Sequence, residues 1–154
     1  MTMTPEERIA ARGLTLPTVP APVAAYVPTV RTGSLVYTSG QLPFVEGKLP
    51  LTGKVGAEVA PDDAKALAAQ CALNALAAVK EEVGDLSHVV RVVKVVGFVA
   101  SAPDFTGQPG VVNGASELIG DLLGDSGIHA RSAVGVTSLP LDAPVEVELI
   151  VEVL

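Results

Sequence analysis

The feature that most constrains the fold is a valine-rich run from Val89 to Ala100, whose only charged residues are Arg91 and Lys94. The run is well short of the roughly 18 consecutive apolar residues that a membrane-spanning helix needs. β-Branched residues at this density favour an extended strand, and a strand this apolar is typical of the interior of a sheet. We therefore predict a central strand from His88 to Ala100.

Helix signals lie on both sides of this strand. Asp62 to Val83 follows a proline, carries acids in its first turn and stops before a glycine, which are the marks of a long helix. A second helix is predicted from about Gly110 to Leu123, with Gly124 after its end. A short N-terminal helix begins at the capping sequence Thr4-Pro5-Glu6-Glu7, and residues 14–22, with three prolines, should form an extended linker.

Four further strands are predicted in two pairs. Residues 23–30 and 34–39 alternate as strands around a tight turn, which predicts a β-hairpin. Residues 129–136 and 144–151 are separated by a proline-containing turn and are expected to close the chain as a second hairpin. The order β-β-α-β-α-β-β predicts one α+β domain over residues 1–154, with a mixed sheet and both main helices on one face.

Composition narrows the possible partners. The chain has a net charge of −7 with ten scattered basic residues and no tryptophan, which argues against nucleic acid. One cysteine and two distant histidines exclude a disulfide framework and make a metal site unexpected. The polar, acidic N-terminus does not resemble a signal peptide, so we expect a cytoplasmic protein without membrane contact. Nearly half of the residues are apolar, which predicts that other copies cover part of the surface as a homo-oligomer.

The chemistry of the chain is concentrated near its end. Arg131 lies among small residues that leave room for a small anion, and a planar guanidinium binds a carboxylate through two hydrogen bonds. Glu146 and Glu148 follow on the next strand. Strand alternation alone would also explain both acids, just as a solvent-exposed ion pair would explain the arginine.

Several segments together resemble one protein family. In order along the chain, they are Tyr37-Thr38-Ser39-Gly40-Gln41-Leu42-Pro43, Asn74–Val79, Val111-Val112-Asn113, Ala130-Arg131-Ser132-Ala133-Val134 and Val145-Glu146-Val147-Glu148. Their sequence and spacing over residues 23–153 resemble the Rid family, also called YjgF-type and often labelled endoribonuclease L-PSP. The N-terminal helix and the loop 101–110 resemble a longer branch of that family.

The resemblance implies a chorismate-mutase-like fold, a homotrimer and ligand clefts between subunits. It also implies cofactor-independent hydrolysis of reactive 2-imino or enamine carboxylic acids to 2-oxo acids and ammonia. By position, Arg131 resembles the arginine that holds the substrate carboxylate, and Glu146 the residue that orients water. The residues that would line the cleft are Tyr26, Ser39, Gly40, Asn113 and Ala133, the last through its backbone carbonyl only.

Two functions other than imine hydrolysis stay open for this sequence. The same cleft could bind a small carboxylate such as a 2-oxo acid without turnover, and the family label also suggests a ribonuclease, which suits an acidic protein poorly. His129 stands where the family usually has proline, and it is either a proton donor or a hydrogen-bonding residue at a strand entry. If the last two strands paired directly, Arg131 and Glu146 would face opposite sides of one subunit and could meet only across an interface, unless a bulge or a one-residue register shift intervenes.

Overall fold

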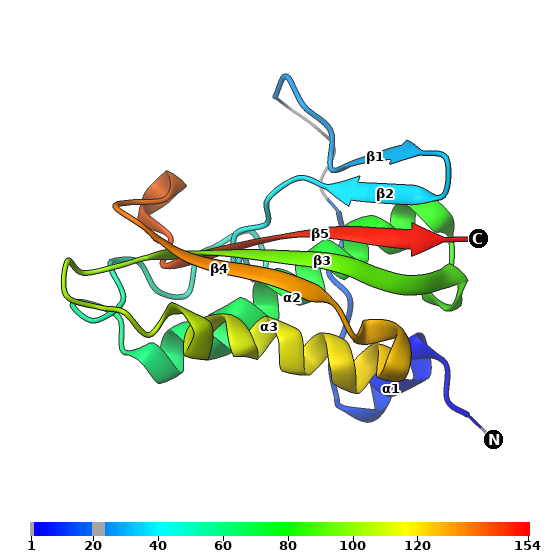
Figure 1. The fold of residues 1–154 in the computed structure, drawn as a ribbon, viewed down its shortest axis with the longest axis horizontal. Helices are drawn as coiled ribbons and strands as arrows, with labels where there is room; N and C mark the ends of the chain where they lie inside the picture. The colour runs from blue at the N-terminus through cyan, green and yellow to red at the C-terminus, as the bar shows by residue number, and fades with distance from the viewer. Residues whose placement is uncertain (1, 20–23) are drawn as a thin grey trace.

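The protein folds around one five-stranded mixed sheet with the strand order β1-β2-β5-β3-β4 (Figure 1). The computed structural model describes residues 2–19 and 24–154. The strands are β1 (Thr29–Thr32), β2 (Leu35–Thr38), β3 (Val89–Ala100), β4 (Ala130–Val136) and β5 (Val145–Val153). The predicted valine-rich strand is β3, and it has a neighbour on each side, as an interior strand must.

Two long helices cover one face of this sheet (Figure 1). They are α2 (Pro61–Val83) and α3 (Gln108–Leu123), and α1 (Pro5–Ala11) packs against α3 at its C-terminal end. Three short 3-10 helices lie between the main elements: η1 (Leu86–His88), η2 (Gly124–Gly127) and η3 (Pro140–Asp142). The predicted α+β class and the placement of the two main helices are therefore confirmed.

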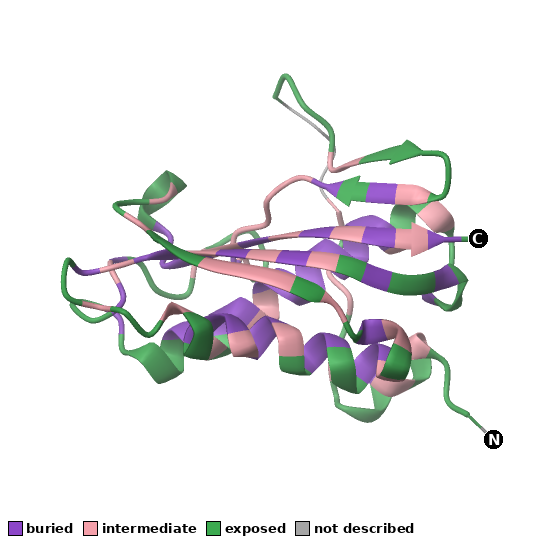
Figure 2. Cartoon of the chain, viewed as in Figure 1, coloured by how far each residue is buried: buried purple, intermediate pink, exposed green. Residues whose placement is uncertain are grey.

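Strict alternation along β5 determines which face of the sheet is the core. The odd-numbered residues from Val145 to Val153 are buried, whereas the even-numbered ones are only half-buried, and Figure 2 shows this alternation along the strand. On β3, Gly97 faces α3, and a Cβ at this position would lie 2.5 Å from a methyl carbon of Val112. The missing side chain lets α3 approach the sheet closely.

The predicted closing hairpin is wrong. β4 and β5 each pair with β3, in parallel and antiparallel register respectively, so that β3 lies between them. The connection α3 returns the chain beside β3 in the same direction, as crossover helices do. The turn at η3, where Leu141 and Asp142 adopt left-handed φ angles of 59°, then carries the chain past the end of β3 to its other edge.

The first strand is shorter than predicted. β1 begins at Thr29, and Ala24 to Tyr26 form a bend without ladder hydrogen bonds; the predicted start at residue 23 lies outside the described residues. The hairpin turn itself is present at Gly33, whose φ of 58° suits a glycine. In the described part of the chain, no helix is long and apolar enough to cross a bilayer.

Candidate functional site

Arg131 lies on the helix-covered face of the edge strand β4 and reaches toward α3. Its Nη1 donates to Asn113 Oδ1 at 2.7 Å and to Ser116 Oγ at 3.3 Å, and its Nη2 donates to the Pro109 carbonyl at 3.4 Å. Pro109, Asn113 and Ser116 are four and three residues apart, so they form one stripe along the helix. The guanidinium is thus held by α3 on one side.

No carboxylate within residues 2–19 and 24–154 forms an ion pair with Arg131. Among the described residues, the basic side chains that pair with carboxylates are Arg12, Lys65, Lys80 and Arg91, and Arg131 is not one of them. All three of its partners are neutral oxygens, and a guanidinium has further N–H groups to donate. The half-buried Arg131 therefore retains both charge and donors for an external anion.

Glu146 forms a second group with Gly40 on a different part of the sheet. The segment after β2 crosses β5 through a bridge between Gln41 and Val147, which places Gly40 directly against the Glu146 side chain. A Cβ on Gly40 would collide with Glu146 Oε1, so this glycine makes room for the carboxylate. The half-buried Glu146 has a raised pKa, first because burial disfavours its charge and second because Glu148 is nearby.

Ser39 follows β2 and directly precedes Gly40, and Tyr26 lies in the bend before β1. Ser39 Oγ donates to the Val27 carbonyl at 2.6 Å, and its backbone N–H donates to Pro28. This ties residues 27–28 to the start of the 39–41 segment. The hydroxyl proton of Ser39 is therefore committed to the backbone, and Tyr26 is 66% exposed.

The predicted residues consequently form two separate groups on opposite faces of the sheet. Arg131 is level with Val95, whereas Glu146 is level with Phe98 on the same strand β3. Residues three apart on a strand point to opposite sides, so the arginine faces the helices and the glutamate faces away from them. Within one chain the two do not meet. We call the first group (Arg131, Asn113, Ala133) the arginine half-site and the second (Glu146, Gly40, Ser39) the glutamate half-site. Tyr26 lies in the exposed bend before β1 and is not assigned to either group.

Sequence reasoning missed Ser116, which contacts both Arg131 and His129. Ser116 follows Asn113 by one helical turn, so the predicted role of Asn113 was a signal that could have pointed to it. The other contact is a hydrogen bond of 2.9 Å between Ser116 Oγ and His129 Nε2.

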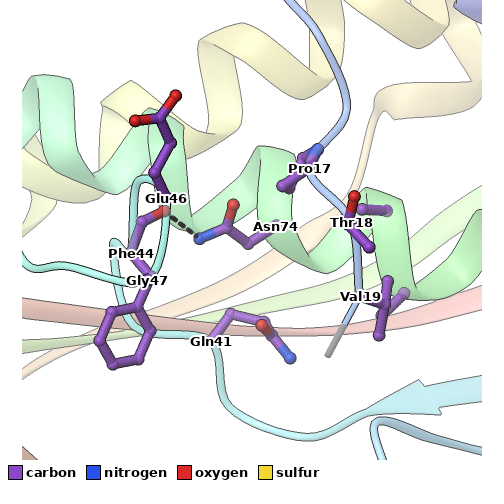
Figure 3. Close-up of a pocket in the computed structure, with 10 residues that line it drawn as sticks. Pro17, Thr18, Val19, Gln41, Phe44, Glu46, Gly47 and Asn74 are labelled. Atoms are coloured by element: carbon purple, nitrogen blue, oxygen red, sulfur yellow. Dashed lines mark hydrogen bonds between the residues drawn. The ribbon is translucent and has the colours of Figure 1, made fainter. Parts of the chain in front are cut away.

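A cavity of about 570 Å³ lies apart from both half-sites, between the N-terminal linker, the 41–47 loop and α2 (Figure 3). Asn74 lines it, but its amide nitrogen donates to the carbonyls of Leu42 and Phe44 and so holds the loop in place. The rest of its described lining is mostly apolar, and Glu46 is the ionisable residue in that lining. Among the residues that the structure describes, the lining includes no predicted site residue and no cation for an anion.

The described residues also include no group of three His, Cys, Asp or Glu side chains arranged to hold a metal ion.

Comparison with known proteins places the chain in a family. Residues 6–153 match the family model described as "YjgF/chorismate mutase-like, putative endoribonuclease". The chain belongs to this family. The resemblance that the sequence motifs indicated is therefore confirmed, and the family's fold agrees with the observed mixed sheet and helices.

Individual relatives agree with this assignment. The chain is 42% identical to Protein TCP17 of Trypanosoma cruzi, over 99% of this chain and 98% of that protein. It is 34% identical to the 2-iminobutanoate/2-iminopropanoate deaminase of Escherichia coli K12, over 85% of this chain and 89% of the deaminase. The crystal structure of Atu1372 from Agrobacterium tumefaciens, a protein of unknown function, has a TM-score of 0.91 and 49% identity, covering 97% of this chain and 92% of its own.

Proposed function

We propose that the protein hydrolyses small 2-imino or enamine carboxylic acids to 2-oxo acids and ammonia, without a cofactor. An enamine first gains a proton on carbon and loses one from nitrogen, which gives the imine. The oxygen of water then bonds to the imine carbon as the C=N π bond breaks, and one proton of the water passes to the nitrogen. The hydroxyl proton of the resulting carbinolamine moves to the amino nitrogen, the C–N bond breaks, and a C=O bond forms as ammonia leaves. Relatives named 2-iminobutanoate/2-iminopropanoate deaminase include those of E. coli K12 and Dermatophagoides farinae, at 34% and 33% identity.

The observation that carries the proposal is the uncompensated charge of Arg131. Its guanidinium is oriented by three neutral oxygens of α3 and pairs with no carboxylate among the described residues. A substrate carboxylate would supply the missing counter-ion through charge-assisted hydrogen bonds. On the same strand face Ala133 is a small side chain, whereas the position over Gly135 is occupied by the Gln108 amide, 2.7 Å from where a Cβ would lie.

We further propose that the complete site forms between copies of the chain, in a homotrimer. The sheet face away from the helices carries apolar side chains that this chain does not cover: Tyr37, Val96, Phe98, Val134 and Ile150. An uncovered apolar face of this kind is typical of a subunit interface. Arg131 lies on the edge strand β4, so a copy packed on this face and across that edge would bring its glutamate half-site toward the arginine half-site, which one chain alone keeps apart.

In this arrangement each group has one task. Arg131 binds the carboxylate of the substrate and so fixes the position of the imine carbon. Glu146, whose raised pKa makes it a stronger base than an ordinary glutamate, accepts a hydrogen bond from water and orients it toward that carbon. Imines also hydrolyse in water, so orientation and electrostatics supply enough of a barrier reduction without a nucleophile or metal.

The test is ammonia release from an imine generated from an amino acid by an oxidase, measured for wild type and for Arg131→Ala. We expect a loss of about 100-fold or more in kcat/KM for the variant, which removes a charge-assisted contact. Arg131→Lys keeps the charge but not the fork and should recover only part of the activity. Arg91→Ala is the matched control, since Arg91 is an exposed arginine of the same sheet that already pairs with Glu152.

Two results would overturn the proposal. Wild-type protein that releases ammonia no faster than buffer would exclude the activity. If that protein still binds a 2-oxo acid in titration calorimetry, the non-catalytic binding function replaces it.

A further inference from the structure

A chain of hydrogen bonds continues behind Arg131, away from the space proposed for the substrate. Arg131 donates to Ser116 Oγ, Ser116 Oγ lies 2.9 Å from His129 Nε2, and His129 Nδ1 lies 2.6 Å from the Gly127 carbonyl. All of these side chains are half-buried. The chain therefore links the proposed anion-binding group to the strand entry that follows η2.

The proton on each group of this chain can be assigned from the partner atoms. A carbonyl oxygen only accepts, so His129 Nδ1 must carry a proton and donate it to Gly127. In the neutral ring, Nε2 is then the acceptor, and the hydroxyl of Ser116 donates to it. With its proton turned toward His129, Ser116 presents its lone pairs to the guanidinium of Arg131, which only donates.

We propose that His129 is a positioning residue for Arg131 and acts through the Ser116 hydroxyl. The imidazole accepts a hydrogen bond from the Ser116 hydroxyl, which leaves the Ser116 oxygen as an acceptor for Arg131. Nη1 of the guanidinium is thereby held between Ser116 and Asn113. The edge formed by Nε and Nη2, where Nη2 also donates to the Pro109 carbonyl, is then presented to the substrate carboxylate in one orientation, so less of the binding energy is used to order it. This inference rests on the proposed function, because it assumes that Arg131 binds a carboxylate.

Two amide substitutions, each of which replaces one ring nitrogen of His129, separate this role from a purely structural one. In His129→Gln, the amide oxygen can take the place of Nε2 and still accept from Ser116, while the bond to Gly127 is lost. In His129→Asn, the amide nitrogen can take the place of Nδ1 and still donate to Gly127, while the contact with Ser116 is lost. A structural role requires the Gly127 bond, and the positioning role requires the Ser116 bond.

The experiment measures kcat and KM for imine hydrolysis, and the dissociation constant of pyruvate, for wild type, both His129 variants, Ser116→Ala and the double variant His129→Asn/Ser116→Ala. We expect His129→Asn and Ser116→Ala each to raise KM and the pyruvate dissociation constant about five- to tenfold, the effect of one lost hydrogen bond, with kcat nearly unchanged. His129→Gln should lie close to wild type. The double variant should be no worse than either single variant, because both remove the same interaction.

The outcomes distinguish this inference from the function on which it rests. Losses in His129→Gln with wild-type behaviour in His129→Asn, or losses that add fully in the double variant, overturn the positioning role while deamination stands. Equal thermal unfolding of the variants excludes a general folding defect as the cause of a raised KM. If wild type neither releases ammonia nor binds pyruvate, the proposed function fails, and the positioning role fails with it.

Discussion

The two faces of β5 differ in how completely one chain accounts for them. The face toward the helices consists of Val145, Val147, Leu149, Val151 and Val153, all at most 2% exposed. The opposite face carries Glu146, Glu148, Ile150 and Glu152, all only half-buried, beside uncovered apolar side chains of β2, β3 and β4. The same strand therefore has a fully buried face toward the helices and a half-buried face on the opposite side, as the alternating colours along it indicate (Figure 2).

This difference separates stability from function. The covered face satisfies every requirement of a core within one chain, since it is apolar and closed by α2 and α3. The other face contains a glutamate whose raised pKa is a cost to the isolated chain, and such costs are typical of functional sites. We infer that the first face specifies the fold and that the second depends on assembly.

The largest expected effect is on the free energy of unfolding, and it should differ between two adjacent apolar residues of β5, Leu149 and Ile150. Leu149→Ala should lower the free energy of unfolding by about 2–5 kcal/mol, because it opens a cavity in the core. Ile150→Ala should act mainly on association, so its effect on the unfolding midpoint should change with protein concentration, while that of Leu149→Ala should not. Chemical denaturation at several protein concentrations measures both. Equal, concentration-independent losses would show that the two faces do not differ in this way.

Glu146→Gln is expected to lower the activity of the protein but to raise its stability slightly at pH 7. The variant should lose about 100-fold in kcat, because an amide cannot act as the base. The folded protein holds the Glu146 proton more tightly than the unfolded chain does, so this group stabilises the fold at low pH and the contribution is lost as the pH rises through its raised pKa. At pH 7 the neutral glutamine should therefore raise the free energy of unfolding slightly, by less than about 1 kcal/mol because water screens the half-exposed group.

Urea unfolding at pH 7 and at pH 4, together with the kinetic assay, tests this variant. Glu152→Gln is its control, since Glu152 lies on the same face of β5 but is not among the groups that raise the pKa of Glu146. A glutamine variant that retains full kcat, or that is less stable than wild type at pH 7, contradicts the role given to Glu146.

Gly40→Ala should have a moderate effect confined to the glutamate half-site. The new methyl group would displace the Glu146 carboxylate, because Oε1 occupies the space that a Cβ needs. We expect a loss of about tenfold in kcat/KM from the misplaced base, with little change in unfolding. Gly110→Ala is the control, since a Cβ there meets open space. Wild-type kinetics in Gly40→Ala would show that Glu146 need not occupy this position.

The smallest effect is expected for the exposed ion pair between Arg91 and Glu152. Their side chains are 64% and 37% exposed, and surface pairs of this kind contribute less than about 1 kcal/mol. Arg91→Ala should shift thermal unfolding only slightly, and less still at high salt, as differential scanning calorimetry can measure. A loss comparable to that of Leu149→Ala would contradict the division between the two faces.

The elements were predictable from the sequence where the signal is local. The valine density of β3, the proline and glycine that bound α2, and the capping box of α1 all depend on neighbours within a few residues. The strand order was not predictable in the same way, because β4 and β5 are adjacent in sequence but pair with β3, and only the three-dimensional path of α3 and η3 determines this. An interior strand and a hairpin partner look alike in alternation.

The candidate site was predictable by residue type more than by arrangement. Arg131 among small residues is a local pattern, whereas its contact with Asn113 and Ser116 depends on how α3 crosses β4. Arg131 and Glu146 lie on opposite faces of the sheet, as expected. The strand pairing assumed in that prediction was wrong, because β4 and β5 each pair with β3 and not with one another.

Subunit mixing tests the central claim, that two chains share one site, most directly. Arg131→Ala and Glu146→Gln proteins, each inactive alone, are unfolded together in equal amounts, refolded, and assayed for ammonia release. A site built from the Arg131 of one copy and the Glu146 of another predicts that about one quarter of the sites regain both groups, with activity in proportion. A mixture as inactive as its two components would contradict the account.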